Sequence, residues 1–263
     1  MENKIIQGDC VEVMKHMSDE YVDLVVTSPP YDNLRDYNGF IFNFEHVAQE
    51  LYRTLKNGGV IVWIVGDQTV DGSETGTSFK QALYFKELGL NLHDTMIYEK
   101  NGAPFPETTR YYQTFEYMFV FSKGKPKSIN LIKDRKNKWE GSFGKRSQRL
   151  KDGTLQQKDA IKCAEYGIRF NFWRINGGYG YTTKDEYAYE HPAMFPERLV
   201  ADHIISWSNS GDLILDPMNG SGTTTKMANI LGRKYVGIDI SEKYCKIARD
   251  RLTQNTLWNK NKQ

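Results

Sequence analysis

Apolar residues are spaced in two different ways along the first half of the chain. One spacing places them three or four positions apart, which predicts a helix with one buried face. The clearest example consists of Phe44, Val47, Ala48, Leu51 and Leu55. Asn57-Gly58-Gly59 follows and predicts the end of this helix, because glycine is common just past a helix C-terminus. The second spacing is an unbroken apolar run, VIVWIV at 60–65, which predicts a strand covered by helices on both faces of a sheet.

The alternation of these two patterns predicts a doubly wound α/β domain with a mostly parallel sheet. Strands are expected at 4–7, 22–26, 60–65, 95–100, 114–124, 212–217 and 234–240. Helices are expected at 11–17, 44–55, 78–88, 196–208, 222–232 and 244–252. The strands at 95–100 and 114–124 have little helical signal between them, so they are predicted to form an antiparallel hairpin at one edge of the sheet.

Residues 125–187 interrupt this alternation and are rich in basic charge. Between Lys123 and Tyr187 there are 16 Lys and Arg against 7 Asp and Glu, a net charge of +9, whereas the rest of the chain has 19 against 26, a net charge of −7. The aromatic residues interspersed with these charges are Trp139, Phe143, Phe170, Phe172, Trp173 and Tyr179. A solvated insertion is one interpretation, and a surface that contacts a polyanion is the favoured one. We therefore divide the chain into 1–124, an inserted region 125–187, and 188–263.

Composition limits the class of protein. With 263 residues, 39% hydrophobic and 26% charged, the chain is typical of a globular protein with one sizeable core. No apolar run reaches the roughly 18 residues of a membrane span, and the N-terminal residues lack the profile of a signal peptide, so a cytoplasmic protein without membrane association is expected. The three cysteines, Cys10, Cys163 and Cys245, have neither disulfide-framework nor metal-ligand spacing, and no metal site is predicted.

The segment LDPMNGSGTTTKMA at 215–228 predicts a strand, a turn with two glycines and the start of a helix. Gly220 and Gly222 allow a ligand to approach the backbone, and Ser221 and Thr223 can cap the helix. The spacing matches neither a phosphate-binding loop nor a dinucleotide fingerprint. About 20 residues further on, a strand ends at Asp239, where a carboxylate can accept hydrogen bonds from both hydroxyls of a ribose or simply cap the next helix. Together these features favour an adenosine-containing cofactor without a pyrophosphate.

The second unusual segment is Thr27-Ser28-Pro29-Pro30-Tyr31, which follows an apolar strand. Two adjacent prolines end a strand abruptly, because each lacks a backbone N–H and has a fixed φ. Taken alone, the segment could be a rigid connector with a packed tyrosine.

These two segments resemble motifs of the amino-group DNA methyltransferases. DPMNGSGTT is similar to the cofactor motif D-P-F-x-G-S-G-T-T, and SPPY to the catalytic motif [DNS]-P-P-[YFW]. Their order, catalytic motif first, is that of the permuted beta group. The resemblance extends to LKNGGVIVW, TFEYMFVFSKG and HPAMFPERL, and so covers nearly the whole chain apart from its basic middle. It implies a Rossmann-like methyltransferase fold, S-adenosyl-L-methionine as cofactor, and duplex DNA as substrate.

The resemblance also implies roles for the matching residues. An exocyclic amine is a poor nucleophile because its lone pair is delocalised into the ring; accepting both amine hydrogens in the transition state localises it. Ser28 Oγ and the carbonyl of Pro29 would be these acceptors, with Pro30 stiffening the turn and Tyr31 stacking on a flipped base. Cofactor contacts are implied at Asp9, Cys10, His191, Phe195, Asp216, Pro217, Gly220, Ser221, Gly222, Thr223 and Asp239.

Among these cofactor residues, Asp9 would reach the adenine, Asp239 the ribose, and Asp216 the amino group of the methionine part. His191 would lie near that methionine end, and Phe195 would form a wall. A turn or helix-cap role for Asp9 and a structural role for His191 are the alternatives.

The first residue of the catalytic motif bears on the target base. In this family serine there is associated with cytosine N4 and aspartate with adenine N6, so cytosine N4 is favoured and adenine N6 is the alternative. An inactive nucleic-acid-binding relative and a methyltransferase of RNA or protein are further alternatives. The resemblance implies that residues 125–187 form a target-recognition region. It also makes a restriction–modification role plausible, with a cognate restriction endonuclease as a second partner. The protein itself is expected to be a monomer or a homodimer.

Overall fold

The computed structural model describes residues 1–30, 42–101, 108–143, 145–159, 161–191 and 194–260. The chain divides into two compact units, which are treated separately: residues 1–130 with 171–263, and residues 131–170. Tyr31 lies outside the described residues.

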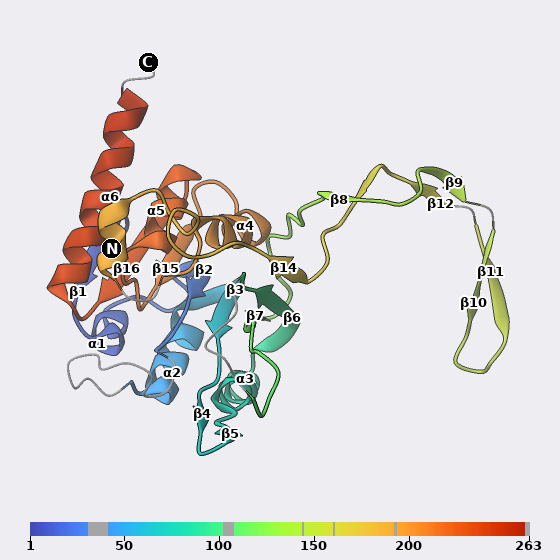
Figure 1. The fold of residues 1–263 in the computed structure, drawn as a ribbon, viewed down its shortest axis with the longest axis horizontal. Coiled ribbons are helices and arrows are strands. Elements are labelled where there is room, and N and C mark those ends of the chain that lie inside the picture. The colour runs from blue at the N-terminus through green and yellow to red at the C-terminus, as the bar shows by residue number, and fades with distance from the viewer. Residues whose placement is uncertain (31–41, 102–107, 144, 160, 192–193, 261–263) are drawn as a thin grey trace. The chain divides into compact units, whose positions relative to one another are not determined.

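An eight-stranded sheet forms the centre of the larger unit (Figure 1). In spatial order its strands are β1 (Lys4–Gln7), β16 (Lys234–Asp239), β15 (Leu213–Asp216), β2 (Val22–Thr27), β3 (Leu55–Val65), β7 (Phe115–Ser122), β6 (Asn91–Glu99) and β14 (Phe172–Arg174). The first five strands are mutually parallel, and β7 is antiparallel to both β3 and β6. The predicted antiparallel pair is therefore confirmed, but β14, which pairs in parallel with β6, forms the edge of the sheet.

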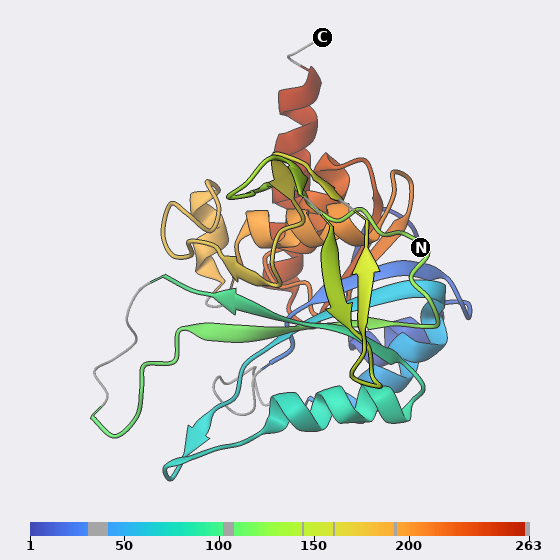
Figure 2. The same ribbon diagram turned by 90° about the vertical axis from the view of Figure 1, so that its right-hand side faces the viewer.

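Helices cover both faces of this sheet. One face carries α1 (Cys10–Lys15), α2 (Phe44–Thr54) and α3 (Thr77–Glu87); the other carries α4 (Glu197–Trp207), α5 (Thr223–Ile230) and α6 (Glu242–Lys260) (Figures 1 and 2). The run 60–65 shows why: Ile61, Trp63 and Val65 belong to one buried cluster, and Val60, Val62 and Ile64 to the other. The prediction of a strand buried on both faces is confirmed, and so is the doubly wound fold class. Short elements complete the unit: β4 (Thr69–Val70), β5 (Ser73–Glu74) and the 3₁₀ helix η1 (Glu186–Glu190).

The predicted end of α2 at Asn57-Gly58-Gly59 is wrong. The helix ends at Thr54, and Leu55 already has extended backbone angles and pairs with Val22 of β2. Gly58 has a φ of +80° within β3, where its N–H donates to the carbonyl of Lys123. The glycines therefore shape an irregular strand start instead of a helix end, because strand pairing on both sides outweighs the local preference.

The smaller unit is one long hairpin, which Figure 1 shows as two extended strands. Its successive antiparallel pairs are β8 (Arg135–Lys136) with β13 (Tyr166–Gly167), β9 (Gly141–Phe143) with β12 (Ile161–Cys163), and β10 (Arg146–Arg149) with β11 (Leu155–Lys158). The turn at its tip is closed by the Thr154 N–H and hydroxyl, which donate to Asp152. No described helix of the chain is long and apolar enough to cross a membrane.

Candidate active site

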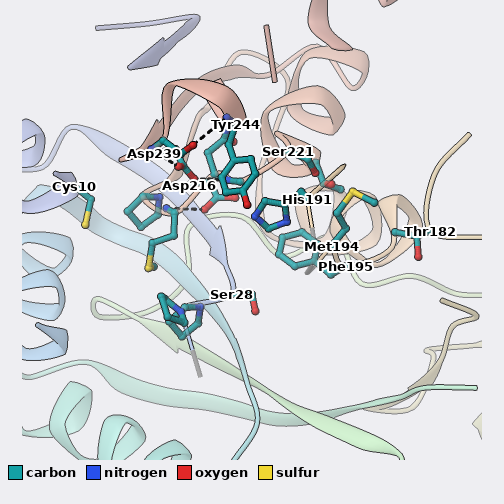
Figure 3. Close-up of a pocket in the computed structure, with 18 of the residues that line it drawn as sticks. Cys10, Ser28, Thr182, His191, Met194, Phe195, Asp216, Ser221, Asp239 and Tyr244 are labelled. Atoms are coloured by element: carbon teal, nitrogen blue, oxygen red, sulfur yellow. Dashed lines mark hydrogen bonds between the residues drawn. The ribbon is translucent and has the colours of Figure 1, made fainter. Parts of the chain in front are cut away.

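The carboxyl edge of the parallel strands gathers the chemistry-bearing residues. Asp239 ends β16, Asp216 ends β15, and Ser28 follows the last residue of β2, on three neighbouring strands. A pocket of about 530 Å³ opens at this edge (Figure 3), which is where ligands bind in open α/β sheets. Of the predicted site residues, it is lined by Asp9, Cys10, Ser28, Pro29, Pro30, His191, Phe195, Asp216, Pro217, Gly220, Ser221, Thr223 and Asp239.

Position 220 requires glycine both because of its backbone conformation and because of a neighbouring side chain. Its φ is +49°, and a Cβ built there would lie 2.8 Å from Nε2 of His191. The His191 ring in turn packs edge-on against Tyr244, with ring centroids 4.4 Å apart. The turn after β15, the segment before α4 and the start of α6 therefore meet at this glycine.

Gly222 has a different role from the one the sequence predicted. It is not among the residues that line the pocket; it is the N-cap of α5, with a φ of +82°. A Cβ there would lie 2.6 Å from Cβ of Ala248, so the missing side chain lets α5 and α6 pack closely. The predicted capping by Ser221 and Thr223 is also wrong, since the cap of α5 has no side-chain hydrogen bond. The guanidinium of Arg251 instead donates to both hydroxyls.

Both carboxylate oxygens of Asp239 accept hydrogen bonds from backbone N–H groups. Oδ2 accepts from the N–H of Gly220 at 2.8 Å, and Oδ1 accepts from the N–H of Ser241 at 2.8 Å (Figure 3). The helix-start alternative for this residue is therefore observed, but each oxygen retains a second lone pair and the carboxylate faces the pocket. Burial raises the pKa of Asp239, although these two backbone bonds oppose the rise.

Asp216 is completely buried and joins the two motifs. Its Oδ1 accepts a hydrogen bond of 2.7 Å from the hydroxyl of Thr27, the residue directly before Ser28. Burial raises the pKa of Asp216 to about 6, although the bonds from Thr27 and from the N–H of Met218 favour the charged form. A cation in the pocket would recover this desolvation energy, because it stabilises the ionised carboxylate.

Asp9 and Cys10 lie where β1 leads into α1. Oδ1 of Asp9 caps α1 by accepting from the N–H groups of Val11 and Glu12, so the capping alternative is observed alongside the place in the pocket wall. Burial raises the pKa of Cys10 to about 12, so its thiol is neutral and packs as a small apolar group.

Several pocket residues were missed by sequence reasoning. Tyr98, Lys100 and Glu116 line the side formed by β6 and β7, where Lys100 and Glu116 are paired at 2.9 Å. The predicted pairing of the strands at 95–100 and 114–124 already contained this signal, because antiparallel partners bring the end of one strand beside the start of the other. The remaining missed residues include Phe42, Thr182, Met194, Asn219, Ile240 and Tyr244.

Comparison with known proteins identifies the family. The family model for N6/N4 DNA methylases matches residues 22–250. The chain belongs to this family. It is a DNA methyltransferase, and the resemblance inferred from its two motifs is confirmed.

Individual members of the family match over nearly their whole length. The chain is 57% identical over 249 residues to the orphan methyltransferase M.BamHII of Bacillus amyloliquefaciens, covering 94% of each protein. It also resembles a DNA modification methylase of Thermus thermophilus, solved with S-adenosyl-L-methionine, at 25% identity and a TM-score of 0.65, covering 96% of this chain and 93% of the other. PvuII DNA methyltransferase (cytosine-N4-specific) shares the fold at 18% identity and a TM-score of 0.66, over 95% and 86% of the two chains.

The methylase uses S-adenosyl-L-methionine, the cofactor of its family, and its pocket suits this molecule. The volume is in the usual range for small-ligand sites, and four carboxylates line it beside aromatic walls: Asp9, Glu116, Asp216 and Asp239. Acidic groups suit a ligand with a sulfonium and an ammonium group. Nδ2 of Asn219, a pocket residue only 4% exposed, is buried without a hydrogen-bond partner among the described residues. Among those residues, no group of three or more His, Cys, Asp or Glu could hold a metal ion.

Proposed function

We propose that this protein methylates the exocyclic N4 amine of cytosine in duplex DNA. The observation that carries the proposal is the position of Ser28, which lines the same pocket as Asp216 and Asp239. The residue directly before it, Thr27, donates a hydrogen bond to Asp216 and so links the two motifs. The cofactor, when bound, supplies an electrophilic methyl group.

In this proposal the carboxylates orient the cofactor. Asp239 accepts hydrogen bonds from the ribose, using the lone pairs that Gly220 and Ser241 leave available. Asp216 pairs with the amino group, and Asp9 contacts the adenine side with the oxygen that does not cap α1. Phe195 and Tyr244 provide apolar walls, and His191 is held between Tyr244 and Gly220.

At the other end of the pocket, Ser28 and Pro29 act on the target amine. Ser28 Oγ and the Pro29 carbonyl each accept one amine hydrogen, which localises the nitrogen lone pair as the new bond forms. Pro29 is buried and Pro30 half-buried, so the carbonyl direction is fixed by packing as well as by proline geometry. Stacking of Tyr31 on the flipped base remains part of the proposal, although this residue lies outside the described range.

We assign the inserted region, residues 125–187, to target recognition. The smaller structural unit within it, 131–170, has 11 Lys and Arg against 5 Asp and Glu, and its two-stranded pair β10 and β11 is exposed at every residue. A hairpin without a core of its own, carrying basic residues on a polar ladder, suits contact with DNA phosphates and a groove. Residues 1–124 then form the catalytic half and 188–263 the cofactor-binding half of the methyltransferase domain.

One argument favours cytosine N4 over adenine N6: serine is the first residue of the SPPY motif. A neutral hydroxyl acceptor could also serve adenine, so the target base needs a direct measurement.

The test is product analysis. The purified protein is incubated with labelled S-adenosyl-L-methionine and unmethylated genomic DNA, and the nucleosides are separated and identified by mass. N4-methylcytosine supports the proposal, N6-methyladenine replaces it with the adenine alternative, and no methylated nucleoside on DNA of varied sequence contradicts both.

A restriction–modification role is the second part of the proposal. It is supported by relatives such as the Type II methyltransferase M.SmaI of Serratia marcescens, 27% identical over 95% of this chain and 90% of that protein, whereas M.BamHII is called an orphan. The proposal predicts a cognate endonuclease. Methylation sites mapped by sequencing, followed by a search of host extracts for cleavage at the same sites that methylation blocks, tests this directly.

A further inference from the structure

Four charged side chains form a closed cluster beneath the turn that leads from β15 into α5. Lys226 Nζ contacts Oδ2 of Asp185 and Oε1 of Glu197, each at 2.7 Å. Arg251 contacts the same two oxygens, Asp185 Oδ2 through Nε at 2.8 Å and Glu197 Oε1 through Nη2 at 2.6 Å. The cluster therefore joins α6, α5, the first residue of α4 and the segment before η1.

The cluster is buried and balanced in charge. Arg251 is 0% exposed and the Lys226 side chain 8%, and two cations face two carboxylates. Burial would raise the pKa of Asp185, but the bonds from Lys226 and Arg251 hold it below its ordinary value. Asp185 therefore stays charged at neutral pH, and its contact and that of Glu197 hold Arg251 in one orientation.

Arg251 also donates hydrogen bonds to two residues that line the cofactor pocket. Nη1 donates to the carbonyl of Ser221 at 2.8 Å and to the hydroxyl of Thr223 at 3.2 Å, and both residues line the pocket (Figure 3 shows Ser221). These are strong bonds, because the donor is charged and shielded from water. Neither Arg251 nor Lys226 lines the pocket itself.

The same cluster also contacts a second part of the pocket lining, at Thr182. Thr183 donates to Oε1 of Glu197 at 2.6 Å, and the N–H of Glu197 donates to the carbonyl of Thr182, another pocket residue, at 3.0 Å. Two walls from distant parts of the sequence are thus tied to one buried guanidinium.

We propose that Arg251 is a positioning residue for S-adenosyl-L-methionine. From behind the pocket wall, Arg251 holds the turn at 220–223 in its cofactor-binding geometry, while Asp185 and Glu197 hold Arg251. The role does not depend on which base is methylated. It places a determinant of cofactor affinity on α6, outside both sequence motifs.

The test compares Arg251→Met with Lys226→Met in the full-length protein. Each variant removes one cation from the same cluster, but only the first also loses the bonds to Ser221 and Thr223. Arg251→Met should weaken cofactor binding, measured by titration calorimetry without DNA, by about tenfold or more, as expected for loss of charged hydrogen bonds. Lys226→Met should change it less than about threefold, even if both variants melt at lower temperature. Hydrogen exchange of the amides at 220–223 should rise in the Arg251 variant alone.

Two further measurements keep the result decisive. With saturating cofactor, Arg251→Met should retain kcat within about threefold, because the residue touches neither substrate. Thr223→Val, which leaves the ion cluster intact, should show a smaller loss of affinity in the same direction, and serves if Arg251→Met does not fold. Equal weakening by Arg251→Met and Lys226→Met, or wild-type affinity in both Arg251→Met and Thr223→Val, would overturn the assignment.

Discussion

The raised pKa of Asp216 should make cofactor binding depend on pH. In the cofactor-free protein this carboxyl is fully buried with a pKa of about 6, and the proposed contact with the cofactor's amino group needs it ionised. Lowering the pH from about 7.5 to about 5 should therefore weaken binding, because the protein must first lose a proton. Asp216→Asn removes the titrating group and is the matched variant.

The magnitude follows from the shift itself. At pH 5, one unit below a pKa of about 6, roughly 90% of Asp216 is protonated, so the apparent Kd should be about tenfold weaker than at pH 7.5. Binding at pH 5 should release about 0.9 proton, and binding at pH 7.5 almost none.

The same shift has the opposite consequence for folding. Because the folded-state pKa lies above the ordinary value of 3.8, the contribution of Asp216 to stability is fully present below that value and is lost as the pH rises through about 6. The difference corresponds to about 3 kcal/mol at neutral pH. Asp216→Asn should therefore stabilise the cofactor-free protein at pH 7.5, by roughly 1–3 kcal/mol, while it weakens cofactor binding.

Calorimetry in two buffers with different ionisation enthalpies measures both affinity and proton release. The reasoning is refuted if wild-type affinity is the same at pH 5 and 7.5, or if Asp216→Asn keeps the full slope. A small residual slope in the variant is expected from Asp239, whose pKa is also raised by burial.

Three other predictions test separate parts of the structure. Ser28→Ala should lower kcat by roughly 10- to 100-fold with little change in cofactor Kd, and Asp239→Ala should do the reverse; single-turnover kinetics and calorimetry separate the two, and exchanged outcomes would reverse the assigned roles. Gly222→Ala combines a φ of +82° with a Cβ 2.6 Å from a side-chain carbon of α6, and should lower the free energy of unfolding by about 2–5 kcal/mol; an unchanged denaturation midpoint would contradict this. Gln81→Leu removes the acceptor of the buried Trp63 indole N–H, 2.8 Å away, and should cost about 1–3 kcal/mol in the same measurement, whereas Gln81→Glu, which keeps the acceptor, tests whether the bond matters.

Local sequence patterns were sufficient to predict secondary structure and burial in segments where one physical requirement dominated. The run 60–65 could only be a strand with two buried faces, and its alternate residues do enter the two clusters on opposite sides of the sheet. The helical stripe at 44–55 places Val47, Ala48 and Leu51 in the core. Its end was mispredicted because Leu55 pairs with β2, which lies distant in sequence.

The site divides in the same way. The sequence by itself determined the two motifs, because the positions of Ser28, the prolines and the glycine turn relative to strand ends follow from local chain geometry. The resemblance of these motifs to the amino-group DNA methyltransferases then implied the cofactor and the class of reaction. Only the tertiary structure showed that Gly222 serves the packing of α5 against α6, and that Lys100 and Glu116 face the same pocket.

Arg251 is the clearest case of a role that the tertiary structure decided. An arginine in the middle of a polar helix is expected to be exposed. The complete burial of Arg251 against Asp185, Glu197 and the turn at 220–223 arises from segments up to 66 residues away that meet only in the folded chain. Such contacts depend on how the helices pack on the sheet, and no local pattern of hydrophobic and polar residues encodes which charged side chains that packing will bring together.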